Sequence, residues 1–196
     1  SLLSILGALR NAEWVTTLHQ DDFYEPSHVQ AHRIVISESD QTLGMISSEA
    51  ISVDIRGKEI PYPRASWLLE ADDGPVKLFL ANLRNHTFPF SGASFRCHAL
   101  HRFAIPWHST AFPDTEFLMK MIPHYKVASL SSPRVRYLEN PESESHHLSQ
   151  QARDFGAFLA LSRVFDYPSF REICDLVPKV EIPQFLDSLD KGISLR

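Results

Sequence analysis

Cysteine is scarce in this chain: of 196 residues only Cys97 and Cys174 are cysteines. The two lie far apart and form neither a CxxC pair nor the Cys/His spacing of a zinc finger. The sequence therefore indicates no disulfide framework and no structural zinc site. We expect the protein to function in the cytoplasm or another reducing compartment inside the cell.

Glycine is also scarce, with seven residues spread thinly along the chain. The patterns GxGxxG and GxxxxGK[ST] are absent, and both need clustered glycines to bring backbone N–H groups against phosphate. The pattern GxSxG is absent too, which removes the usual nucleophile elbow of an α/β-hydrolase. These absences argue against a common dinucleotide-binding fold, a P-loop and an α/β-hydrolase.

Long apolar runs are missing as well, since none approaches the ~18 residues that a membrane-spanning helix needs. The first ten residues, SLLSILGALR, lack the basic leader and cleavage pattern of a signal peptide. Apolar residues nevertheless make up 43% of the chain, and 13 residues are phenylalanine. We therefore expect a soluble protein with no membrane span, folded as one domain over residues 1–196.

Apolar spacing divides the chain into three parts. Leucine and isoleucine recur at helical spacing over residues 1–18, so we expect an N-terminal helix there. Short β-branched and apolar segments follow, and they predict strands over residues 31–39, 43–57, 65–74, 76–84, 93–105, 125–130 and 133–139, with one helix at 114–122. Helical spacing returns from residue 142 to residue 192. The expected fold class is α+β: a mostly antiparallel sheet over residues 31–138, an N-terminal helix and a helical C-terminal third.

Charge is unevenly distributed. Between Arg84 and Arg136 there are seven Lys or Arg residues against Asp114 and Glu116 only, so this segment carries +5 and the rest of the chain −10. Aromatic residues and five of the ten histidines lie in the same segment. Such a mixture suits a surface that holds phosphates while flat groups stack. The overall pI of about 6.0 makes nucleic acid a less favoured partner, and the basic side chains could instead form a solvated face balanced by acidic neighbours.

Our leading hypothesis is a binding module with an aromatic-lined pocket or groove and a basic rim. The partner would be an anionic small molecule or another protein, and the apolar C-terminal helices would help to form the groove. The candidate ligand-binding residues all belong to the basic, aromatic segment: Arg96, His101, Arg102, Trp107 and His108.

A first alternative is a metal enzyme. His19 and Asp21 form an HxD pair, His86 supplies a third ligand, and Arg96 could grip a carboxylate. In this order of residues the chain resembles the 2-oxoglutarate-dependent oxygenases, which would imply Fe(II) as cofactor. Those enzymes place a strand before the HxD pair, whereas this sequence predicts a helix there. The competing interpretation is a turn in which Asp21 and Asp22 end that helix.

A second alternative is a hydrolase or transferase that depends on histidine. His108 lies in a proline-bracketed segment, and Glu116 or His124 could assist it. Cys97 and His98 are a poorer pair, because neighbours on the strand that we expect there point to opposite faces.

Overall fold

The structure of the chain, a computed structural model, describes residues 12–60, 75–76, 78–79, 88–103, 113–139, 150–166 and 168–177, together with 183 and 187. Strands and helices are both present, and three of the helices stand between strands along the chain. The mixed content is consistent with the expected α+β class. No helix within the described ranges is long and apolar enough to cross a membrane.

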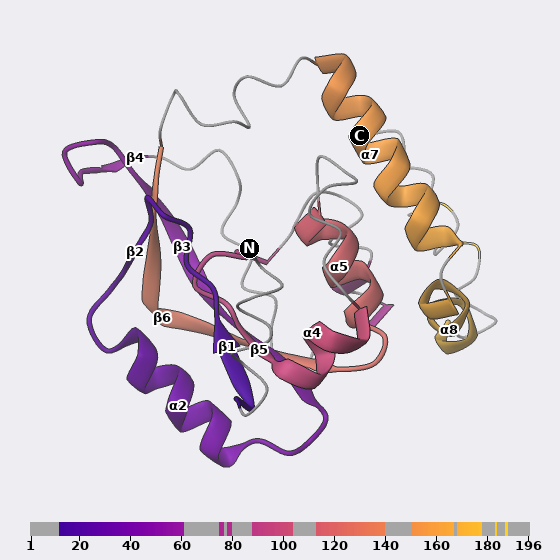
Figure 1. Cartoon of the computed structure of the whole chain (residues 1–196), viewed down its shortest axis with the longest axis horizontal. Helices are drawn as coiled ribbons and strands as arrows, with labels where there is room; N and C mark the ends of the chain where they lie inside the picture. Colours follow the sequence, from indigo (N-terminus) through magenta and orange to yellow (C-terminus); the bar gives the residue numbers. More distant parts are fainter. Residues whose placement is uncertain are drawn as a thin grey trace.

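A six-stranded sheet forms the centre of the fold (Figure 1). Its strands are β1 (Trp14–Thr16), β2 (Phe23–Tyr24), β3 (Leu43–Val53), β4 (Glu59–Ile60), β5 (Ser94–Arg96) and β6 (Lys126–Leu138). Their order across the sheet is β1-β5-β3-β6-β2, and β4 pairs with the far end of β3. Sheet neighbours are thus mostly distant in sequence.

The pairing of β3 with β6 is the longest in the sheet, and it is parallel. It begins at Leu43 beside Lys126 and ends at Val53 beside Leu138. The other four pairings are antiparallel. The expectation of a mostly antiparallel sheet therefore holds for the short strands and is wrong for the central pair. Alternating side chains reveal which face of a strand is buried, but not the direction of its neighbour.

Helices cover both faces of the sheet. They are α2 (His28–Glu38), α4 (Cys97–Phe103), α5 (Pro113–Met121), α7 (Gln150–Phe165) and α8 (Pro168–Leu176). Figure 1 shows α2 alone on one side, with the other four on the opposite side. The helix expected at 114–122 is present as α5, and α7 and α8 lie in the part of the chain where we expected helices.

Several expected elements are wrong. Residues 14–16 form strand β1 instead of continuing an N-terminal helix, and residues 31–38 form the larger part of α2 instead of a strand. The expected strand at 93–105 ends at residue 96, where α4 begins. The described residues at 75–76 and 78–79 are helical as well. The strand expected at 65–74 lies outside the described residues.

Helix α2 shows why the prediction of a strand from local sequence was wrong. Its RIVIS sequence favours a strand, but β propensity amounts to only ~1 kcal/mol and tertiary contacts readily override it. His28 and His32 are one helical turn apart, so both rings point from α2 toward the sheet, and both are buried. A strand would also place residues 28 and 32 on one face, but roughly 13 Å apart, so only a helix brings the two rings into contact.

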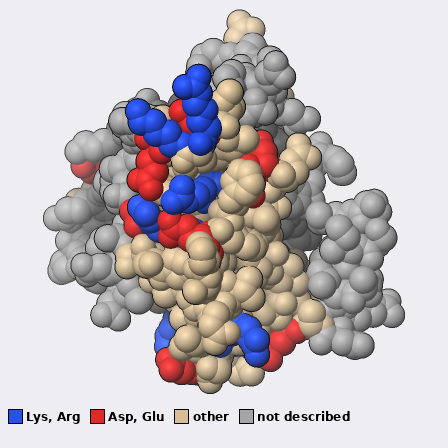
Figure 2. All heavy atoms as spheres, turned by 90° about the vertical axis from the view of Figure 1, so that its left-hand side faces the viewer, with Lys and Arg blue, Asp and Glu red and all other residues tan. Residues whose placement is uncertain are grey.

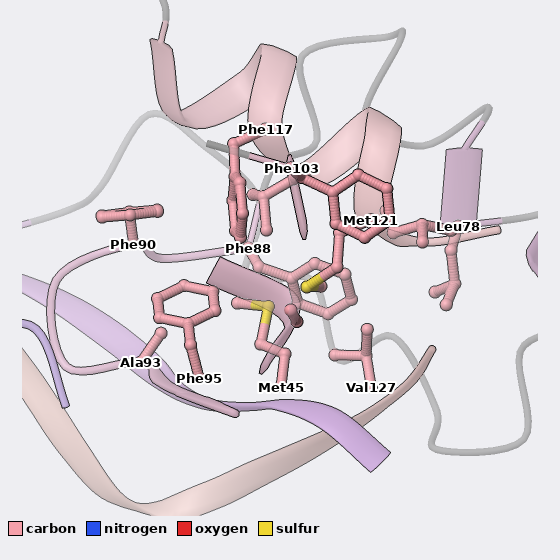
Figure 3. Packing of buried hydrophobic residues seen from close by; sticks show 13 residues of the cluster. Met45, Leu78, Phe88, Phe90, Ala93, Phe95, Phe103, Phe117, Met121 and Val127 are labelled. Carbon is pink, nitrogen blue, oxygen red and sulfur yellow. The ribbon is translucent and has the colours of Figure 1, made fainter. Parts of the chain in front are cut away.

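The face of the sheet opposite α2 carries the main apolar core (Figure 3). Phe95 from β5 meets Phe117 from α5 edge to face, with ring centres 5.4 Å apart. Phe90 packs against Phe95 at 5.0 Å. Leu78 and Val127 lie at one margin of this cluster. Edge-to-face aromatic packing of this kind fixes α4 and α5 on the sheet.

Beneath α2 the packing is polar. The rings of Tyr24 and His28 stack with centres 4.3 Å apart, and His28 lies 4.2 Å from His32. His32 bridges two hydroxyls, with Nδ1 2.7 Å from Ser94 Oγ and Nε2 2.9 Å from Ser48 Oγ. Neither ring nitrogen of His28 completes a hydrogen bond within the described residues, although the backbone of Gly92 lies beside the ring. Burial lowers the pKa of His28 and lowers that of His32 to about 4.

We predict that this cluster makes the fold sensitive to acid. His32 binds a proton below pH 6.5 in the unfolded chain but only near pH 4 in the folded one. The free energy of unfolding should therefore decrease as the pH falls from 6.5 toward 4. The part of this decrease that comes from His32 should reach about 2 kcal/mol at pH 4.5. Urea unfolding at pH 7.5 and 4.5 measures this decrease in the wild type and in His32→Gln. The glutamine amide can also bridge two hydroxyls. The same pH dependence in both proteins would contradict the assignment, and the exposed His101→Gln is the control.

Candidate functional site

A cavity of about 190 Å³ opens where β3 and β6 begin. It is lined by Thr42, Pro75, Leu78, Ile122, Pro123, His124, Tyr125, Lys126 and Val127. Leu78 and Val127 also belong to the apolar core, so one wall of the cavity continues into it (Figure 3). His124, Tyr125 and Lys126 bring polar groups to the same cavity. Ligand sites usually combine apolar walls with a few polar groups.

The parallel register of β3 and β6 builds this cavity. The backbone N–H of Lys126 donates to the carbonyl of Thr42 at 2.8 Å, which joins the residue before β3 to the first residue of β6. The pairing then skips Gly44, between Leu43 and Met45. A Cβ on Gly44 would lie 2.5 Å from Cβ of Tyr125, so only glycine allows Tyr125 to pack there.

Aromatic rings pack around His124 and Tyr125, which line the cavity. Phe103, at the end of α4, stacks on His124 with ring centres 5.0 Å apart and planes inclined by 23°. Tyr125 meets Phe103 edge to face at 6.2 Å. The Tyr125 hydroxyl lies 2.7 Å from Nδ1 of His98, on the first turn of α4. These contacts fix the turn that joins α5 to β6 against α4.

Two oppositely charged groups meet at one atom of His124. Its Nδ1 lies 3.0 Å from a carboxylate oxygen of Glu172, on α8, and 3.4 Å from Nη2 of Arg102, on α4. Burial lowers the pKa of His124, the Glu172 carboxylate opposes that shift and Arg102 adds to it. The ring is therefore mainly neutral at pH 7, with one nitrogen donating and the other accepting.

A second pair of charges lies at the same end of the sheet. The ammonium of Lys126 is 3.7 Å from the carboxylate of Asp40, and both side chains are mostly exposed. Arg102 and Lys126 thus provide two cationic groups near the cavity, each with an acidic residue close by. Exposed pairs of this type are weak and exchange partners readily. The arrangement can hold an anion beside a flat apolar group.

The sequence suggested Arg102 as a ligand-binding residue and His124 as a catalytic helper, and it suggested no role for Tyr125, Lys126 or Glu172. It did predict a strand from residue 125, after the helix that ends at Pro123. Nothing in the sequence pairs Glu172 with His124, because that contact joins α8 to a turn far from it along the chain.

Arg96, expected at a basic rim, lies inside the protein. Its Nε donates to the carbonyl of Leu43 at 2.8 Å, Nη2 to the carbonyl of Asp40 at 2.9 Å, and Nη1 to the carboxylate of Glu13 at 2.7 Å. The guanidinium also lies over the ring of Trp14, at 4.7 Å. The structure therefore gives Arg96 a structural role, joining β1 and β5 to the start of β3. Arg96 does not line the cavity.

The remaining expected ligand-binding residues are divided. Arg102 and His101 follow each other on the last turn of α4, and both are exposed. Arg102 reaches His124, which places it at the site. Trp107 and His108 lie outside the described residues.

The expected metal ligands form no described centre. Within the described ranges no three His, Cys, Asp or Glu side chains are grouped so that they could hold a metal ion, and His86 lies outside those ranges. His19 and Asp21 lie in the loop between β1 and β2. The neighbouring Asp22, not Asp21, faces His19, with 3.6 Å between Oδ2 and Nδ1. The helix-ending turn that we expected is wrong too, because a strand precedes this loop.

Glu116, a proposed helper of His108, is almost fully buried in α5. Its carboxylate lies 2.5 Å from Nζ of Lys120 and 3.7 Å from Nη1 of Arg163, on α7. These ion pairs join α5 to α7. The contacts of Glu116 are therefore structural. His124 instead contacts residues of α4 and α8.

Part of the positive charge of the central segment is neutralised where β6 pairs with β2. Arg134 and Arg136, on β6, each lie within 3.8 Å of the carboxylates of Glu25 and Glu59. Figure 2 shows basic and acidic side chains side by side on the upper part of the face in view. The acidic neighbours come from N-terminal segments of the chain, as the solvated-face interpretation expects. These two arginines therefore add little positive potential for binding phosphate.

Comparison with known proteins adds no assignment. No family model matches the chain, and no curated protein matches it significantly. The contacts around His124 are therefore the basis for a functional proposal.

We predict that Arg96→Lys destabilises the fold although it keeps the charge. A lysine cannot replace three directional donors, so the carbonyls of Leu43 and Asp40 would lose partners. We expect the free energy of unfolding to fall by about 2 kcal/mol in urea unfolding. Arg102→Lys, the same change at an exposed position, should cost less than about 0.5 kcal/mol. Equal losses in the two variants would show that Arg96 is not structural.

Proposed function

We propose that the protein is a binding module and that the cavity beside His124 takes a small anionic ligand with a flat apolar body. The observation that carries the proposal is the position of His124, whose ring lines the cavity, stacks on Phe103 and lies next to Arg102. An apolar wall would accept the body of the ligand. Arg102 and Lys126 would attract its anionic group.

The size of the cavity narrows the ligand class. Sites for drug-sized molecules usually enclose about 300–1,000 Å³, whereas this cavity encloses about 190 Å³. It is suited to a single ring bearing one charged group. A partner protein could insert one side chain of the same chemistry, but the small ligand needs no further surface and is the function that we propose.

Nucleic acid has less support than a small anion. Arg96 is buried, and Arg134 and Arg136 are paired with carboxylates. A strand of RNA or DNA needs a continuous row of available cations. We also propose a reducing compartment inside the cell, which the two free cysteines support.

The proposal predicts that benzoate binds and that benzyl alcohol, which has a similar ring without the charge, binds much more weakly. For a ligand this small we expect a dissociation constant of about 1 mM. NMR titration should shift the signals of His124 and Tyr125 first. Arg102→Gln should weaken benzoate binding about fivefold, because it removes the nearest cation.

The control is Arg33→Gln, which removes the same charge from the exposed surface of α2, on the other side of the sheet. It should leave the affinity within about 1.5-fold of the wild type. Equal weakening by both variants would show a general charge effect. The absence of benzoate-dependent shifts at His124 would refute the proposed site.

A further inference from the structure

Glu172 makes a contact that its own helix does not require. The neighbouring Ile173 is fully buried, and Val177 is nearly so. These two pack with Phe79, Met119 and Val164 in a second apolar cluster. That cluster anchors α8 to α5 and α7 without Glu172. The Glu172 side chain is half exposed and turns toward the site, where its carboxylate meets Nδ1 of His124.

Only one of the two groups at Nδ1 of His124 can form a hydrogen bond with it in a given tautomer. With a proton on Nδ1 the ring donates to Glu172, and without it the ring accepts from Arg102. The shorter distance, 3.0 Å against 3.4 Å, favours the bond to Glu172. A carboxylate therefore already lies where the ring and a cation converge.

We propose that Glu172 is a built-in occupant of the anion position and that a ligand carboxylate displaces it. This inference rests on the proposed function and deepens it in two respects. It names the anionic group as a planar carboxylate, because that is the group the position holds now. It also makes α8 a latch that competes with the ligand.

The latch can open without unfolding the helix. Glu172 is half exposed, and a polar contact of that exposure shifts an equilibrium by no more than about fivefold. The apolar contacts of Ile173 and Val177 remain when the carboxylate leaves. Since a competing internal group lowers the apparent affinity of a ligand, removing it should raise that affinity by the same factor.

The test compares two variants of α8. Glu172→Gln removes the competing charge and nearly keeps the shape of the side chain. Asp175→Asn removes the same charge from an exposed position on the same helix. We expect benzoate to bind about threefold to fivefold more tightly to Glu172→Gln and within about 1.5-fold of the wild type to Asp175→Asn.

A spectroscopic readout accompanies the titration. In the free protein at pH 7, the ¹⁵N shift of His124 should show a proton on Nδ1. Glu172→Gln should move that proton population toward Nε2, because the acceptor for Nδ1–H is then weaker. Asp175→Asn should leave the shift unchanged.

The outcomes separate the latch from the site. If the wild type binds benzoate with dependence on Arg102 but Glu172→Gln behaves like Asp175→Asn, the latch is wrong and the binding function stands. If neither the wild type nor Glu172→Gln binds, both fail. Binding that appears only in Glu172→Gln supports the latch. Tighter binding of phenyl phosphate than of benzoate would overturn the carboxylate class.

Discussion

The parallel pairing of β3 with β6 is the constraint on which the rest of this structure depends. Because the strands run in the same direction, the residues before them, Asp40 to Thr42 and His124 to Tyr125, lie at the same edge of the sheet. Arg96 stabilises that edge from inside by binding two backbone carbonyls at the start of β3. An antiparallel arrangement would have placed the start of β6 against the opposite end of β3, and no cavity would form beside His124.

Different interactions hold the helices on the two faces of the sheet. Phenylalanine rings fix α5 on β5, and these ring contacts contain no titrating group. The buried rings of His28 and His32 fix α2, and burial disfavours their charged form. The cavity lies on the aromatic side, where Leu78 and Val127 connect it to the apolar core. The apolar wall of the site is therefore independent of protonation, while the helix on the other face of the sheet carries the acid sensitivity.

Apolar periodicity was sufficient to predict mixed helix and strand content and a helix at the position of α5, and α7 and α8 lie in the part of the chain where it predicted helices. It failed at α2 and α4, where contacts with strands distant in sequence decide the conformation. Arg102 and His124 were both found from composition, but as members of different hypotheses. Their proximity follows from the turn after α5 packing on α4, which depends on the direction of β6 and on the lack of a side chain at Gly44. Neither feature can be deduced from residue types alone.

Several basic side chains of the central segment have their own local partners, so the net charge of the segment does not describe its surface. Arg96 is satisfied in the interior, Lys120 pairs with Glu116, and Arg134 and Arg136 pair with glutamates of neighbouring strands. Arg102 and Lys126 remain near the cavity, beside Glu172 and Asp40. Because acidic side chains accompany both cations, the proposed ligand would gain little from the net field of the segment. Under the proposal that Glu172 occupies the anion position, affinity would depend on replacing that carboxylate, so geometry at His124, more than the total charge, would decide which anions bind.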